Sequence, residues 1–196
     1  MFEQILILIS VTTVLVGAPG PAPLALASSA VTYGMQGSLP LFAGQLVGLF
    51  LVMIGTSLGL ARVFLSYPEL KAVCQLIGAA YFIFFAYQIS TAPIQSERRT
   101  VETSGFAFGV IIIALNPRVY VAIFAIFSQF LLPFNDSQVA IFMTAITCWL
   151  VALVVNMLWL ALGRSLKPLF VNKSQIRMIR FILSVLMVSS AIFPLI

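Results

Sequence analysis

One positively charged side chain, Arg118, stands within a long apolar stretch, directly after Asn116 and Pro117. Asn is a preferred N-cap residue and Pro suits the first position of a helix, so these two residues predict that a helix begins here. The first turn of a helix presents unpaired N–H groups and the positive end of the helix dipole, which together favour an anion. The guanidinium of Arg118 adds a full charge in that turn. The three residues therefore predict a binding site for an anionic group such as a carboxylate.

A second cluster with unusual backbone properties lies in the first apolar stretch. Residues 17–23 have the sequence GAPGPAP, so three prolines and two glycines fall within seven residues. Proline removes a helical hydrogen bond and glycine weakens a helix, so the cluster predicts a break after which Pro21 or Pro23 opens a new helix. The alternative is a secretory signal peptide cleaved near Ala30. A signal peptide needs a positively charged start, whereas the first ionisable side chain is Glu3, so we expect the break.

The side chains needed for catalysis or metal binding are scarce. The chain has no histidine, and its acids lie near the ends of the apolar stretches or between them: Glu3, Glu69, Glu97, Glu102 and Asp136. No Walker A phosphate loop is present, and Cys74 and Cys148 do not form a C-x-x-C pair. We therefore expect no metal, no cofactor and no enzymatic activity.

The composition is that of a membrane protein. Of the 196 residues, 62% are hydrophobic and 8% are charged, and the mean hydropathy is +1.15. A membrane-spanning helix needs roughly 20 apolar residues. The chain predicts six such helices, at 4–31, 39–62, 69–91, 105–132, 138–163 and 175–195. Little sequence remains between them, so we expect an all-α polytopic membrane protein with one transmembrane domain over residues 1–196.

The net charge of +5 is better explained by membrane topology than by a nucleic-acid partner. Basic residues gather between the third and fourth predicted spans and between the fifth and sixth, which places both connections on the cytoplasmic side. The second group comprises Arg164, Lys167, Lys173, Arg177 and Arg180. We therefore expect lipids, and no nucleic acid, around this protein.

The two predicted breaks occupy matching places in an internal repeat. With three spans in each half, residues 1–91 and 105–196 would enter the membrane from opposite sides, joined by a linker at 92–104. Such a 3+3 inverted repeat, with interrupted helices in corresponding positions, is typical of secondary transporters. Here the interruptions fall in the first and fourth spans. Non-helical backbone at this depth must be covered by protein or line a wet cavity, so both breaks should face the interior.

Polar side chains are rare elsewhere at this depth, and Gln45 and Asn156 are the main candidates for contact with a ligand. The alternative for each is a hydrogen bond between helices, as for Thr144 and Thr147. Span two also carries small residues on one face, which predict close helix packing either inside the protomer or across a homodimer. These are Gly44, Gly48, Gly55 and Gly59.

Three stretches resemble the LysE superfamily, and most closely its homoserine/threonine (RhtB-type) exporter branch. They are PGPAPLALASSAVTYGMQGSLPLFAGQLVG at 19–48, LIGAAYFIFFAYQI at 76–89 and GVIIIALNPRVYVAIFAIFSQFL at 109–131. The resemblance implies an exporter of amino acids or related metabolites in the bacterial inner membrane, driven by the proton motive force. Two positions depart from the family pattern. Leu49 follows Gly48 where the family often has Asp or Asn, and Arg118 replaces a Lys. Losing that acid argues against a cationic substrate and against proton coupling through it.

We therefore expect an alternating-access exporter of a neutral, zwitterionic amino acid, with carbonyls near the two breaks meeting the amine. The expected substrate-binding residues are Gly17, Pro19, Gly20, Pro21, Gln45, Asn116, Pro117, Arg118 and Asn156. Two alternatives stay open. One is an exporter of another small anionic solute, since the site as predicted carries only positive charge. The other is a non-transporting membrane protein that serves assembly or lipid handling on the same scaffold.

Overall fold

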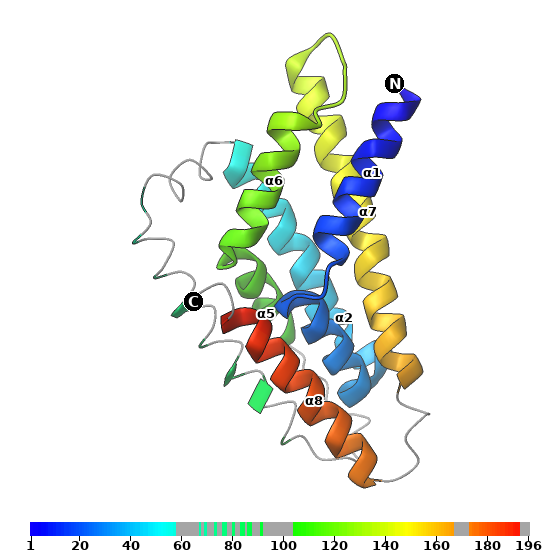
Figure 1. The fold of residues 1–196 in the computed structure, drawn as a ribbon, viewed down its shortest axis with the longest axis vertical. Coiled ribbons are helices and arrows are strands. Elements are labelled where there is room, and N and C mark those ends of the chain that lie inside the picture. Colours follow the sequence, from blue (N-terminus) through cyan, green and yellow to red (C-terminus); the bar gives the residue numbers. More distant parts are fainter. Residues whose placement is uncertain are drawn as a thin grey trace.

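The computed structural model describes residues 1–57, 104–166 and 173–192, together with single residues between 67 and 91. Within these ranges it contains helices and no strands (Figure 1). The helices are α1 (Phe2–Gly17), α2 (Pro21–Ser57), α5 (Ser104–Ala114), α6 (Pro117–Gln129), α7 (Ser137–Leu166) and α8 (Lys173–Ile192). Most of the predicted third span and of the linker at 92–104 lies outside the described residues.

The break predicted in the first span is present between α1 and α2. Helix α1 closes with a hydrogen bond from Ala18 N to Val14 O, at 3.1 Å, and α2 starts at Pro21. The amides that would continue α1 belong to Pro19 and Pro21, and proline has no N–H to donate. The carbonyls of Leu15 and Gly17 therefore lack the helical partner four residues ahead.

The second predicted break separates α5 from α6, whose axes differ by 60°. Asn116 is the N-cap of α6, and its side chain accepts a hydrogen bond from Arg118 N at 3.1 Å. The amide of Val119 donates to Asn116 O at 3.0 Å. Because both amides bond to Asn116, the carbonyls of Ala114 and Leu115 also lack their partner four residues ahead.

The turn expected between the first two predicted spans falls inside α2. Helix α2 contains Gly34 at φ 74° and ψ 177°, a left-handed backbone that glycine adopts readily. The chain reverses direction there, as the blue and cyan parts of α2 show in Figure 1. The expected connection over 32–38 is therefore wrong in its length, because helix continues on both sides of this one residue. Ser29 Oγ and Ser38 Oγ join the two arms at 2.8 Å.

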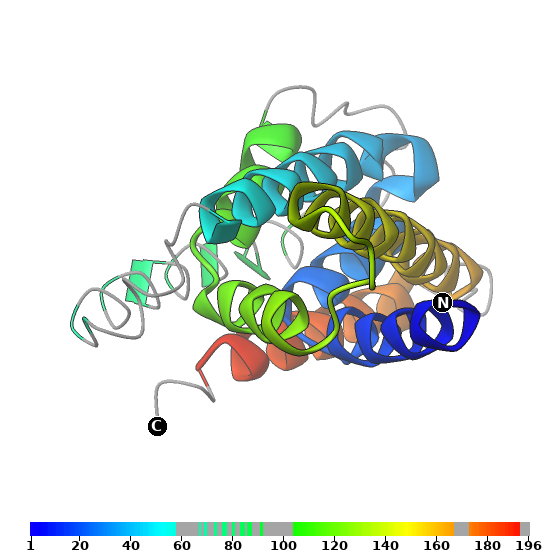
Figure 2. The same ribbon diagram turned by 90° about the horizontal axis from the view of Figure 1, so that it is seen from above.

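Helix α2 lies at the centre of the bundle and packs against α5, α7 and α8 (Figure 2). Its contact with α5 is unusually close. A Cβ added to Gly44 would lie 2.1 Å from Phe106 O, and one added to Gly109 would lie 2.4 Å from Leu41 O. Gly44 and Gly48 thus serve packing inside the protomer, which answers the question left open by their spacing. Gly59 lies outside the described residues.

Two helices, α2 and α7, are long and apolar enough to cross a membrane, and the bent pair α5 and α6 gives a third candidate span. Helix α1 is a shorter apolar helix. The prediction of an all-α membrane protein agrees with these helices, whereas six spans in a 3+3 inverted repeat remain a prediction.

Arg180 lies in a different environment from the one that the charge pattern suggested. It was grouped with the basic cytoplasmic connection, but it is buried in α8 with 2% of its surface exposed. Its Nη2 donates to Thr32 O at 3.4 Å. The long apolar stem of an arginine can pack among apolar side chains while its charged end bonds to a backbone carbonyl. In this way the guanidinium of Arg180, in the sixth predicted span, reaches Thr32, directly after the first predicted span.

Candidate substrate site

Both helix breaks open into one cavity of about 80 Å³. A single water needs about 10–15 Å³ of such space, so the cavity has room for several water-sized groups. Of the nine predicted site residues, six line it: Gly20, Pro21, Gln45, Asn116, Arg118 and Asn156. The other three are not among the lining residues. Gly17 and Pro19 lie at the end of α1 and just beyond it, and Pro117 is the first residue of α6.

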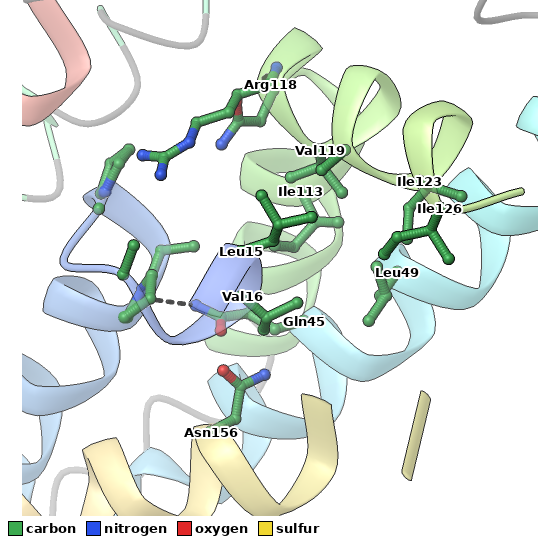
Figure 3. Close-up of a pocket in the computed structure, with 17 residues that line it drawn as sticks. Leu15, Val16, Gln45, Leu49, Ile113, Arg118, Val119, Ile123, Ile126 and Asn156 are labelled. Atoms are coloured by element: carbon green, nitrogen blue, oxygen red, sulfur yellow. Dashed lines mark hydrogen bonds between the residues drawn. The ribbon is translucent and has the colours of Figure 1, made fainter. Parts of the chain in front are cut away.

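Arg118 forms the cationic side of the cavity. Its guanidinium extends from the start of α6 toward the first break (Figure 3), where a Cβ added to Gly20 would lie 3.4 Å from Arg118 Nη1. The side chain therefore joins the two breaks in space. Arg118 lines the cavity, and its binding of a substrate stays a prediction. Among the described residues, its guanidinium forms no ion pair with an acid.

Gln45 and Asn156 form a neutral polar side of the same cavity, and Figure 3 shows their amides pointing toward one another. Gln45 is 1% exposed, and its Nε2 donates to Ala22 O at 3.0 Å. Its Oε1 is buried and accepts no hydrogen bond from any described residue. Gln45 thus makes the interhelical bond that is the default for such a residue, but it uses only one end of its amide.

Thr144 makes hydrogen bonds within the protein, which was the alternative to contact with a ligand. Its Oγ1 donates to Ala140 O at 2.7 Å and accepts from Leu132 N at 3.0 Å, which ties the segment after α6 to α7. The hydroxyl of Thr144 thus both donates and accepts a hydrogen bond within the protein, and Thr144 is not among the residues that line the cavity. The bond to Leu132 satisfies a buried amide outside a helix.

Apolar side chains from four helices make the remaining walls. Helix α6 contributes Val119, Ile123 and Ile126, which fall on one helical face because they are separated by four and three residues. Leu49 of α2, Ile113 of α5 and the α1 residues Leu15 and Val16 complete these walls. The sequence prediction did not include any of these side chains. Their spacing from one another was the available signal, because residues three or four positions apart share one face of a helix.

A comparison with known families identifies the chain. The model of the LysE type translocator family matches residues 13–196. The chain belongs to this family. The resemblance found in the three sequence stretches is thereby confirmed.

Several curated relatives of this LysE type translocator are cysteine/O-acetylserine efflux proteins. Those of Salmonella typhimurium strain LT2 and Escherichia coli O157:H7 are 25% and 24% identical to it over 177 residues, and that of Klebsiella pneumoniae is 26% identical over 175 residues. Each alignment covers 89% of this chain and 88% of the relative. No solved structure matches the chain.

The LysE type translocator is a membrane protein, as its apolar helices and its family agree, and membership in a translocator family favours transport over enzymatic catalysis. Within the described residues, no group of three His, Cys, Asp or Glu side chains could hold a metal ion. Cys148 is instead packed in the core, where its Sγ lies 3.5 Å from Thr12 Oγ1 and joins α7 to α1. The arrangement is therefore suited to reversible binding through charge and hydrogen bonds.

Proposed function

We propose that this LysE type translocator is a secondary active exporter of small, neutral, zwitterionic amino acids across the bacterial inner membrane. The observation that carries the proposal is the single cavity bounded by both helix breaks, with Arg118 on one side. Interrupted helices at a midplane site are the arrangement by which secondary transporters hold a substrate carboxylate. Relatives named as cysteine/O-acetylserine efflux proteins support export of an amino acid.

In the proposed complex, the substrate carboxylate binds the Arg118 guanidinium beside the positive end of the α6 dipole, where the first amides of the helix are already capped by Asn116. Charge-assisted hydrogen bonds are the strongest type available there, and a guanidinium can bind a carboxylate through two parallel N–H groups. The substrate amine is placed near the carbonyls freed at the breaks, including those of Gly17 and Ala114. A zwitterion uses both kinds of group at once, whereas a cationic amino acid would bring a second positive charge to a cavity that no described acid lines.

Transport would follow an alternating-access cycle in which the two repeat halves, each with one broken helix, move about this site. The proposal includes six spans, both basic connections in the cytoplasm, and the proton motive force as the energy source. It also allows a homodimer. The relevant perturbation is an uncoupler, which should abolish concentrative export while leaving binding intact.

The test is efflux of preloaded, labelled amino acids from cells that express the protein, screened as a mixed pool with and without an uncoupler. We expect selective loss of a small neutral amino acid. Arg118→Ala should weaken apparent affinity by roughly 10- to 150-fold, because a hydrogen bond to a charged group contributes about 1.5–3 kcal/mol. Arg164→Ala is the matched control, since Arg164 lies exposed at the end of α7 with its Nη1 3.6 Å from Met35 Sδ.

Full export by a folded, membrane-inserted Arg118→Ala protein would refute the assigned role of Arg118. A second candidate function is export of a small anion without an amine, favoured by the positive charge of Arg118 at the cavity. Competition by a carboxylic acid that lacks the amine separates the two. Absence of efflux of any solute, from protein shown to be in the membrane, would instead favour an assembly or lipid-handling role.

A further inference from the structure

The buried amide of Gln45 carries an inference that goes beyond the general binding of an amino acid. Its Nε2 is occupied by Ala22 O, while its Oε1 has no hydrogen-bond partner among the described residues, although only 1% of the side chain is exposed. Buried polar atoms in folded proteins are almost always paired, and an unpaired one needs a reason. A ligand with a hydrogen-bond donor would supply the missing partner.

The orientation of this amide is fixed by chemistry. A carbonyl oxygen such as Ala22 O can only accept a hydrogen bond, so the nitrogen of Gln45 must face it and the oxygen must point the other way. The backbone of Gln45 is held as well, because its amide nitrogen lies at the close contact where a Cβ added to Gly109 would come within 2.8 Å. The free acceptor therefore sits on a rigid support and is preorganised to receive a donor.

We infer that Gln45 Oε1 accepts a hydrogen bond from the substrate ammonium, and that Gln45 with Asn156 makes the translocator select zwitterionic amino acids over carboxylates that lack an amine. The inference rests on the proposed function. Arg118 and the start of α6 supply the subsite for the negative end of the substrate, and the facing amides of Gln45 and Asn156 supply the subsite for the positive end (Figure 3).

Asn156 suits the second place in this amine subsite. It lines the cavity with 6% of its surface exposed, and within the described part of the chain its side chain makes no hydrogen bond. An asparagine amide carries both an acceptor and two donors, so it can present its oxygen to an ammonium. It comes from α7, whereas Gln45 comes from α2, so the subsite joins two helices that already pack together.

Neutral acceptors and carboxylates give different selectivity. A site built to hydrogen-bond a particular group discriminates strongly against analogues that lack it, because its buried polar atoms are then left unpaired. An amide oxygen meets that need for one ammonium but brings no charge to balance a second one. The subsite should therefore accept a zwitterion, reject its deaminated analogue and disfavour a dibasic amino acid.

The experiment uses everted inner-membrane vesicles that contain the full chain, energised and given labelled alanine, serine and cysteine. Propionate, 3-hydroxypropionate and 3-mercaptopropionate serve as unlabelled competitors that lack the amine. The wild-type protein should prefer an amino acid over its deaminated analogue at least about tenfold. Gln45→Leu keeps a side chain of similar size without the amide, and it should reduce this preference about tenfold or more while binding of the deaminated acid is retained. An unchanged preference in Gln45→Leu would overturn the inference.

Gln45→Glu provides a gain of function that a misfolded protein cannot imitate. The added carboxylate loses the hydrogen bond to Ala22 O, but it can turn both oxygens to the cavity and balance a second positive charge, so competition by 2,4-diaminobutyrate should improve about tenfold. A folded Gln45→Glu protein that gains nothing for this dibasic amino acid contradicts the inference. Arg164→Gln serves as the control variant.

The outcomes separate the inference from the proposed function. If the wild-type protein transports no amino acid, the proposed function fails and the inference falls with it. If transport depends on Arg118 but the preference for an amino acid over its deaminated analogue is the same in Gln45→Leu as in the wild-type protein, the proposed function stands and only the inference fails.

Discussion

The close contact of α2 with α5 makes the effect of adding one methyl group predictable from distances. A Cβ on Gly44 would lie 2.1 Å from Phe106 O, whereas real Cβ atoms essentially never come within 3.0 Å of another heavy atom. The helices would have to separate by about 0.9 Å, because the obstructing atom belongs to the backbone and cannot rotate away. Overpacking of this kind costs typically about 1–3 kcal/mol. Alanine recovers about 1 kcal/mol through its higher helix propensity, so Gly44→Ala, with its clash against backbone, should destabilise the fold by up to about 2 kcal/mol.

Four glycines form a graded series for this test. The nearest atom to an added Cβ lies at 3.5 Å for Gly17, 3.0 Å for Gly48, 2.4 Å for Gly109 and 2.1 Å for Gly44. We expect thermal stability in detergent to fall in this order, with Gly17→Ala close to the wild-type protein. Transport by Gly44→Ala should fall as well, since α5 leads directly to the break at Asn116. Equal unfolding temperatures for Gly44→Ala and Gly17→Ala would show that the packing argument is wrong.

Three further predictions concern single residues. Gly34→Ala should destabilise the protein by about 1–2 kcal/mol, because φ 74° suits glycine and strains alanine, and the loss should be visible in thermal unfolding. Thr144→Val should cost about 1–3 kcal/mol by leaving the buried Leu132 amide unpaired, whereas Thr147→Val, which removes only a bond to its own helix, should be nearly neutral by the same assay. Arg118→Lys should retain transport but raise the apparent KM up to about tenfold, because the charge remains while the planar fork is lost; an unchanged KM would argue against bidentate binding.

Local backbone chemistry made the two breaks predictable. Asn116-Pro117 has the residues of a helix start, and GAPGPAP cannot maintain helical hydrogen bonds, so neither prediction needed tertiary information. The membrane environment then required both breaks to be covered or to line a cavity, which is why Arg118 was expected to face the interior, whereas Asn156 was a candidate only as a rare polar residue at this depth.

The parts that escaped prediction depend on contacts between distant residues or on one backbone angle. The sequence does not reveal that Gln45 bonds to Ala22, 23 residues earlier, or that its oxygen is left free. Nor does it show that Arg180 crosses from α8 to Thr32. Gly34 was placed inside an expected loop, because a glycine gives no sign in sequence that it reverses the chain alone while helix resumes at once.

The proline cluster has a consequence for changing the cargo of this exporter. The carbonyls at Leu15 and Gly17 lack helical partners because Pro19 and Pro21 have no N–H, so these acceptors belong to the main chain and persist through most side-chain replacements. Recognition of the part common to all amino acids would then be hard to lose by mutation. In the proposed complex, the variable part of the cargo would meet replaceable apolar walls, which include Leu49, Ile123 and Ile126. A library that varies those three walls and keeps residues 17–23 and 116–118 should therefore retain transporters while altering which side chains they accept.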